Sequence, residues 1–200
     1  MKKIILSIAM VVATLAACNS SNKKSTESQN LSSGSQSISQ TDNTNVTKSS
    51  ITDGKNTVSV KEIVNAYLQM KNAFTEDNST GAASAGKKLE AVFENFDKSV
   101  LTAAQKKTYE DVEADAREHA EHIGANGGNI EHQREHFEPL SNDIYDLVKA
   151  FGGGQVLYKV FDPMFNNGKG AFWLSETKEI KNPYMGKAML TSGTVKEELK

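Results

Sequence analysis

Cysteine is almost missing from this sequence, because Cys18 is the only one in 200 residues. The chain therefore has no internal disulfide, and beyond Cys18 it offers no thiol nucleophile and no thiolate metal ligand. An excess of charge of one sign is missing too, since 23 Lys and Arg stand against 25 Asp and Glu. A nucleic-acid-binding protein would show a concentrated basic field, so we expect no nucleic-acid partner.

Long hydrophobic runs are also missing, with one short exception at the start of the chain. After Lys2 and Lys3, residues 4–17 are almost entirely apolar. This run is shorter than the roughly 20 apolar residues that a helix needs to cross a bilayer. A cationic start, an apolar segment and small residues at its end are typical of a secretory signal peptide, which we place at residues 1–17.

The residues next to Cys18 make this signal more specific. Leu15-Ala16-Ala17-Cys18 resembles the lipobox of bacterial lipoproteins, in which the thiol is acylated and cleavage leaves the cysteine as the new N-terminus. The alternative is an ordinary cleaved signal beside a chance cysteine. The resemblance implies export and lipid attachment at Cys18. The protein would then face the periplasm on the cell membrane or outer membrane, with cell-surface exposure as an alternative.

Composition divides the rest of the chain into three segments. Residues 18–56 are mostly Ser, Asn, Thr, Gln and Lys, and bury too little apolar surface to offset the entropy of ordering. We interpret them as a disordered tether. Helical patterning then fills residues 57–154, which we expect to form a helical bundle, and residues 155–200 form a C-terminal tail packed on that bundle.

Capping patterns predict where two of the helices begin. Ser59 and Glu62 have the spacing of a capping box, and an apolar stripe of helical period follows them. Thr102 and Gln105 repeat the pattern before a third stripe, which ends at Gly124.

The other two predicted helices contain small residues or a proline that affect their structure. The second should start near Ser79, and its small residues would allow another helix to approach closely or leave its first turns frayed. The fourth should run from Ile130 to Phe151. Pro139 should kink or restart it, with Ser141 as a cap for the restart.

Four amphipathic helices with short connections favour a mainly α protein built as an antiparallel four-helix bundle. The C-terminal tail is expected to be irregular and rich in aromatic residues, apart from a short strand at residues 156–161. The remainder of the tail contains several residue patterns typical of turns. We expect Phe172, Trp173 and Tyr184 to pack on the bundle.

All four histidines lie around the turn between the third and fourth helices. Within each helix they are three or four residues apart, so each pair shares a face. Residues equidistant from the turn of an antiparallel hairpin lie side by side, and both cross-pairs are centred near Gly127. Imidazole suits zinc, copper and nickel, so copper and zinc are the candidate ions. The candidate ligands are His119, His122, His132 and His136.

A solvated polar face would explain the same pattern. Glutamates alternate with the histidines, and the sequence leaves open whether the two pairs point toward each other or both away. A pH-sensitive contact is a third alternative, because free histidine titrates near pH 6.5.

The clearest resemblance to a known family is carried by the tail. It resembles the domain-of-unknown-function family 3347, an exported helical domain that occurs alone or fused to membrane-fusion subunits of CusB-type heavy-metal efflux pumps. The resemblance covers roughly residues 60–198 and implies a helical domain, copper or silver handling, and an efflux adaptor as partner. The residues that carry it are Asp162-Pro163-Met164, Lys169–Ser175, Glu179–Tyr184 and Met189–Gly193, with Gln133-Arg134 in the fourth helix.

The chain departs from this family at two typical cysteine positions. The family has Cys-Pro-Met where this chain has Asp162-Pro163-Met164, and Cys-Gly where it has Ser192-Gly193. Met164 and Met185 remain as thioethers that suit copper(I), although methionine also serves as flexible core filler. Asp162 would supply an oxygen ligand and favour harder or borderline metals.

These observations give a leading hypothesis and an alternative. The leading one is a membrane-anchored module that binds a transition metal outside the cytoplasm, through the histidines and secondarily Asp162, Met164 and Met185. The alternative is a metal-independent lipoprotein that acts through protein contacts. We expect no enzyme, because no nucleophile elbow, phosphate loop or H-E-x-x-H motif is present.

Overall fold

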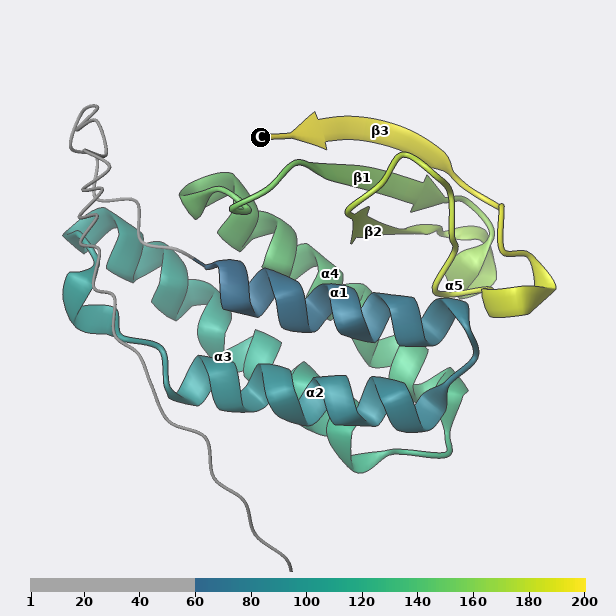
Figure 1. Ribbon diagram of the computed structural model, residues 1–200, viewed down its shortest axis with the longest axis horizontal. Coiled ribbons are helices and arrows are strands. Elements are labelled where there is room, and N and C mark those ends of the chain that lie inside the picture. Colours follow the sequence, from purple (N-terminus) through teal and green to yellow (C-terminus); the bar gives the residue numbers. More distant parts are fainter. Residues whose placement is uncertain (1–59) are drawn as a thin grey trace, which may run out of the picture. The chain divides into compact units, whose positions relative to one another are not determined.

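The computed structural model describes residues 60–200 (Figure 1). The predicted signal peptide at residues 1–17, the lipid attachment at Cys18 and the tether at residues 18–56 lie outside the described residues. Within residues 60–200, no helix is long and apolar enough to cross a membrane.

Four long helices make up most of the described chain, which confirms the mainly helical class. Consecutive helices pack against one another, and the first also contacts the fourth. A short 3-10 helix, η1 (Lys98–Val100), lies between the second and third. The long helices are α1 (Lys61–Thr75), α2 (Ser79–Glu94), α3 (Ala103–Ala125) and α4 (Ile130–Phe151).

Side-chain caps set three of the long-helix starts, including that of α4, where the His132 amide donates to the side chain of Asn129 at 3.3 Å. The capping box of α3 is confirmed, because the Gln105 amide donates to Thr102 Oγ1 at 3.3 Å and the Thr102 amide donates to Gln105 Oε1 at 3.1 Å. At α2, the Gly81 amide donates to the side chain of Asn78. The N-cap residue of α1 is Val60, which makes no side-chain cap, and the predicted cap Ser59 lies outside the described residues.

The predicted restart of the fourth helix after Pro139 is wrong. Helix α4 continues through Pro139, because a proline removes one ladder bond while the buried stripe on either side keeps its packing. Ser141 does not cap a new helix. Its hydroxyl is buried, donates to the carbonyl of Phe137 at 2.8 Å and lies 2.8 Å from the hydroxyl of Tyr67.

We had expected an irregular tail, but the tail forms a small antiparallel sheet with strand order β2-β1-β3. Only β1 had been predicted. The third strand alternates exposed and half-buried residues and carries three charges, so it has little hydrophobic signal. The elements of the tail are β1 (Leu157–Asp162), α5 (Phe165–Gly168), β2 (Ala171–Ser175), η2 (Gly186–Ala188) and β3 (Thr194–Leu199).

Aromatic side chains join the sheet to the helices. Trp173 and Tyr184 are buried, as predicted, whereas Phe172 is only half-buried. The ring of Tyr67 stacks on Phe137 with centroids 5.1 Å apart. The Tyr67 hydroxyl accepts from the Leu174 amide of β2 at 3.0 Å, and the Tyr184 hydroxyl donates to the Phe172 carbonyl at 2.6 Å. Both buried hydroxyls are therefore satisfied.

Close contact between α2 and α3 explains the small residues of the second helix. A Cβ atom on Gly86 would lie 2.7 Å from the carbonyl oxygen of Ala120 and 2.8 Å from the amide nitrogen of Gly124. Both neighbours are backbone atoms, which cannot rotate away. Of the two alternatives, close approach of another helix is therefore the correct one.

Gly86→Ala should lower the free energy of unfolding by about 1–3 kcal/mol, because it forces the two backbones apart. Urea unfolding followed by circular dichroism measures this change. The control is Ser84→Ala, at an exposed position of the same helix, which should change stability by less than about 0.5 kcal/mol. Equal stability of the two variants would contradict the packing described here.

Candidate metal site

The α3–α4 hairpin brings all four histidines together. His119 Nδ1 and His136 Nδ1 are 3.2 Å apart, and the rings of His122 and His132 have centroids 6.3 Å apart. The two cross-pairs predicted from the spacing are therefore side by side. Of the two arrangements that the sequence left open, the structure has the one in which the histidines point toward each other.

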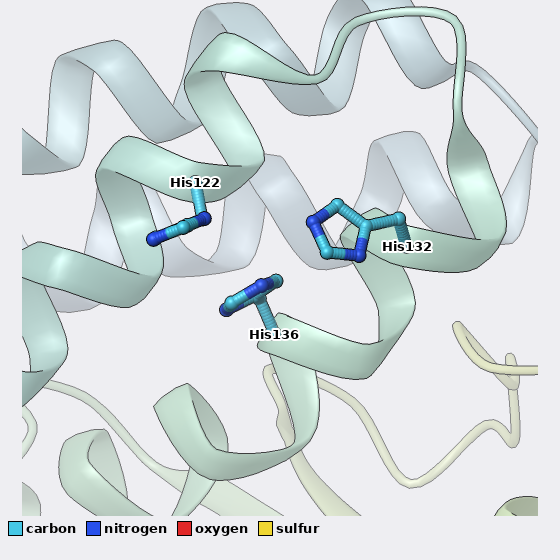
Figure 2. Close-up of side chains that lie close together, drawn as sticks. All are labelled: His122, His132 and His136. Atoms are coloured by element: carbon cyan, nitrogen blue, oxygen red, sulfur yellow. The ribbon is translucent and has the colours of Figure 1, made fainter. Parts of the chain in front are cut away.

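Three of the four rings form the tightest group. One nitrogen from each of His122, His132 and His136 can be chosen so that all three lie within 4.8 Å of one another (Figure 2). His132 and His136 meet edge to face, with centroids 4.7 Å apart and an interplanar angle of 83°. His122 instead stacks on His136 at 4.4 Å and 10°. All three side chains are half-buried, so a small ion reaches them from solvent.

A bound ion would need a tighter arrangement than the one present. Three imidazoles at tetrahedral zinc, with bonds of about 2.0–2.1 Å, place their nitrogens about 3.3–3.4 Å apart. Each ligand uses a lone pair in its ring plane, and the lone pairs of two stacked rings run parallel instead of converging. The group therefore fits a transition metal in residue type, and one ring must turn for all three to bind.

Gln133 fixes the position of the hairpin that carries these rings. Its buried amide nitrogen donates to the carbonyl of Ile123 at 2.9 Å and to the carbonyl of Ser79 at 3.1 Å. Its side-chain oxygen accepts from the Ser79 hydroxyl at 2.7 Å, and that hydroxyl in turn accepts from the Gly128 amide at 2.7 Å. One side chain thus joins α4 to the end of α3 and the start of α2.

Arg134 ties the same turn of α4 to the tail. Its guanidinium donates to the carbonyls of Pro183 at 2.7 Å and Phe74 at 2.9 Å. It also pairs with Asp77 at 2.7 Å, and the second oxygen of Asp77 accepts from the Lys187 amide at 3.1 Å. The sequence singled out Gln133-Arg134 only through the family resemblance, and the structure gives both residues an anchoring role.

Carboxylates surround the cluster. Between Lys107 and Lys149 the chain carries eleven Asp and Glu residues, with Arg117 and Arg134 as the only Lys or Arg. A cavity of about 590 Å³ adjoins the cluster on α4. Such a field raises the local concentration of cations. The polar residues that line the cavity include Glu131, Glu135 and Glu138 of α4 and Asn166 and Asn167 of α5.

The environment keeps two of the rings neutral. Burial lowers the pKa of His119, although the nearby carboxylates oppose the shift. Burial also lowers the pKa of His136, and its three neighbouring imidazoles lower it further. A metal ion binds the neutral ring, so both shifts keep these histidines competent at a lower pH than free histidine.

Asp162, which was proposed as a ligand, is not part of this group. Asp162 is fully buried, and its carboxylate accepts from the Met164 amide at 2.9 Å, from Asn182 Nδ2 at 2.9 Å and from the Ser192 hydroxyl at 3.3 Å. It therefore holds the turns of the tail together. Met164 is 52% exposed and Met185 is half-buried, and the metal-ligating group found within residues 60–200 does not include a carboxylate from the tail.

One buried titratable group was missed by the sequence analysis. Asp143 of α4 has a buried oxygen, Oδ2, that makes no hydrogen bond within the described residues. Burial raises the pKa of this carboxyl to about 7, helped by the charges of Asp115 and Asp146. Its exposed-looking sequence neighbourhood gave no signal, because only the packing of α3 against α4 buries it.

Comparison with known proteins supports the family resemblance for the helices. The model of a family described as "Protein of unknown function (DUF3347)" matches residues 63–155. This confirms the resemblance from α1 to just beyond α4. The match ends before β1, so it does not include the tail motifs that had seemed the more specific. No curated protein and no solved structure matches the chain.

Asp162→Ala should lower the free energy of unfolding by about 2–4 kcal/mol, because three donors lose their acceptor in a buried turn. The affinity of the Asp162→Ala variant for Zn(II) should equal that of the parent protein. Chemical denaturation and calorimetric titration measure the two quantities. The control Glu94→Ala removes an exposed carboxylate of α2 and should leave both unchanged. Loss of zinc affinity in a folded Asp162→Ala variant would contradict the anchoring role.

Asp143→Asn should stabilise the protein at pH 8 by about 1–2 kcal/mol and have much less effect at pH 4. The raised pKa means that the folded state binds more protons than the unfolded state between about pH 4 and pH 7. The folded protein therefore loses stability as the pH rises through that window. Urea unfolding of both proteins at the two pH values measures the difference, and a pH-independent difference would contradict the assignment.

Proposed function

We propose that this protein is an exported lipoprotein, anchored to a membrane through acylated Cys18, whose helical domain binds a divalent transition metal ion outside the cytoplasm. The observation that carries the proposal is the convergence of His122, His132 and His136 within 4.8 Å. Three imidazoles on two adjacent helices, within an acidic surface, form a donor set that suits such an ion.

The donor set favours particular ions. Neutral imidazole suits Zn(II), Cu(II) and Ni(II), whereas soft thiolate and thioether ligands suit Cu(I). The only thiol is Cys18, which acylation would occupy, and the group of converging ligands consists of imidazoles alone. The proposed cargo is therefore zinc or copper in the divalent state, instead of the Cu(I) or Ag(I) that the family's cysteines would suit.

In this proposal the four long helices work as an antiparallel four-helix bundle. Such bundles build metal sites from side chains that project from facing helices. The bonds of Gln133 support this arrangement, because they hold α3 and α4 in the register that pairs the histidines. The protein does no catalysis in this scheme, and the ion is its cargo.

The anchor and the family resemblance suggest where the ion goes. A polar tether at residues 18–56 would let a membrane-held domain meet a partner at some distance from the bilayer. An efflux adaptor of the CusB type is the proposed partner, and the periplasmic face of the cell membrane or outer membrane is the proposed location.

A second candidate function is a metal-independent lipoprotein that acts through protein contacts. A groove of about 600 Å³ beside the sheet favours it, with Phe161, Phe172 and Lys196 in its lining. The Nζ atom of Lys159 lies 3.8 Å from the ring centroid of Phe172 and 3.8 Å from that of Tyr145. Half-buried aromatic rings beside lysines are suited to protein recognition.

Calorimetric titration of the full chain with Zn(II), Cu(II) and Ag(I) tests the metal function. Every variant carries Cys18→Ser, so that a free thiol does not bind. We expect one-to-one binding of Zn(II) or Cu(II) at micromolar affinity or better, lost in His132→Ala/His136→Ala. Met164→Leu/Met185→Leu is the control and should bind as the parent does.

Each other result has a defined meaning. Tight Ag(I) binding that is lost only in the methionine variant would place the site in the tail. Absence of saturable binding for all three ions would refute the metal function and leave the protein-contact function.

A further inference from the structure

Two residues beside the cluster contact ring nitrogens of its ligands without belonging to the three-residue group. Glu135 Oε2 is 3.2 Å from His132 Nδ1, and His119 Nδ1 is 3.2 Å from His136 Nδ1. On the basis of the proposed metal function, we infer that Glu135 and His119 are positioning residues. They keep the proton of each ligand ring on Nδ1 and leave Nε2 of His132 and Nε2 of His136 as the atoms that bind the ion.

A neutral imidazole offers only one ligand atom at a time. One ring nitrogen carries a proton and donates, and the other has the lone pair that a metal needs. The hydrogen bond made by the first nitrogen selects which of the two is free. Metal-binding histidines accordingly donate their second nitrogen to a carboxylate, carbonyl or water, and losing that partner costs about 10–100-fold in affinity.

The direction of the His132 contact follows from its partner. An ionised carboxylate has no proton to give, so Glu135 accepts and His132 Nδ1 donates. The lone pair of His132 is then on Nε2. The Glu135 side chain is 70% exposed, so this contact contributes little to folding stability. Its main effect is on the tautomer and orientation of His132.

The direction of the His136 contact follows from the need for a ligand atom. If His119 donated, His136 would use its Nδ1 lone pair for the hydrogen bond and carry its proton on Nε2, so neither nitrogen could bind an ion. With His136 donating, its Nε2 is free and His119 becomes the acceptor. His119 is therefore the partner of a ligand and not itself a ligand.

The ring geometry agrees with this division of roles. His132 and His136 are held through Nδ1 and lie nearly perpendicular, at 83°, so their in-plane lone pairs are not confined to parallel planes as those of stacked rings are. His122 stacks on His136, and its nearest carboxylate contact, from Nε2 to Glu118 Oε1, is 3.9 Å, which is too long for a hydrogen bond. His122 is thus the ring that turns to complete the site.

Ring nitrogen NMR of the full chain in its metal-free form reads the tautomers directly. The spectra are recorded near pH 8, above the ordinary titration range of imidazole. We expect the proton of both His132 and His136 on Nδ1, with His119 protonated on Nε2. Adding Zn(II) should shift the Nε2 resonances of His132 and His136 and leave their Nδ1 protons in place. Metal-free rings with the proton on Nε2 of His132 or His136 would overturn the inference.

Zinc affinities of matched variants provide the second arm. Glu135→Ala and Glu131→Ala each remove one carboxylate from exposed positions of α4, one turn apart, and only Glu135 contacts a histidine nitrogen. We expect about a tenfold or greater loss of affinity in Glu135→Ala relative to Glu131→Ala. His119→Leu should lose affinity similarly, and His119→Gln, which keeps an acceptor, should recover part of it.

The two arms separate this inference from the proposed function. Equal affinities for Glu135→Ala and Glu131→Ala, with zinc still bound by the parent protein, would refute the positioning roles and leave the metal function standing. Failure of the parent protein to bind Zn(II), Cu(II) or Ag(I) would refute the metal function and the positioning roles together, whatever tautomers the metal-free rings show.

Discussion

The buried amide of Gln133 joins three helices at the end of the molecule where the histidines lie. It donates twice and accepts once, to partners in α2 and at the end of α3, so none of its polar atoms is left without a partner. A buried amide without such partners would cost several kcal/mol, so the three helices can meet at this point in only one register. The pairing of His119 with His136 follows from that register and not from any attraction between the rings.

Without the surrounding acidic residues, the close packing of the histidines would be less stable. Four imidazoles within contact distance repel one another once protonated, and burial of His136 adds to that cost. The carboxylates of α3 and α4 offset the repulsion while leaving the ring nitrogens accessible. The same carboxylates attract any cation that can replace the protons. One distribution of charge therefore serves the folding of the hairpin and the proposed binding of an ion.

The sequence predicted the local features well because they depend on near neighbours. The capping box at Thr102, the bounds of α4 and the cross-pairing of the histidines all follow from spacing within a helix or about one turn. The direction in which the histidines face depends on the rotation of α3 and α4 about their axes, which distant residues such as Gln133 determine. The hydrogen bonds by which Asp162 holds the tail turns were not predicted for the same reason. Its donors, Asn182 and Ser192, come from later turns that only the folded sheet brings near.

The contacts of Arg134 connect the proposed metal site to the C-terminal tail. The guanidinium is held by the carbonyl of Pro183 and by Asp77, and it belongs to the helical turn between His132 and His136. A protein that displaced the tail turn at residues 183–187 would remove the Pro183 carbonyl from that guanidinium, leaving Phe74 and Asp77 as its partners. It would thereby weaken the support of the turn of α4 on which both rings depend. Binding of the ion and binding of that protein would then be linked, and such linkage is reciprocal. An ion that tightens the same turn must therefore weaken the binding of that protein. Cargo and partner would oppose each other through a single side chain, which is the behaviour needed to give up an ion at its destination.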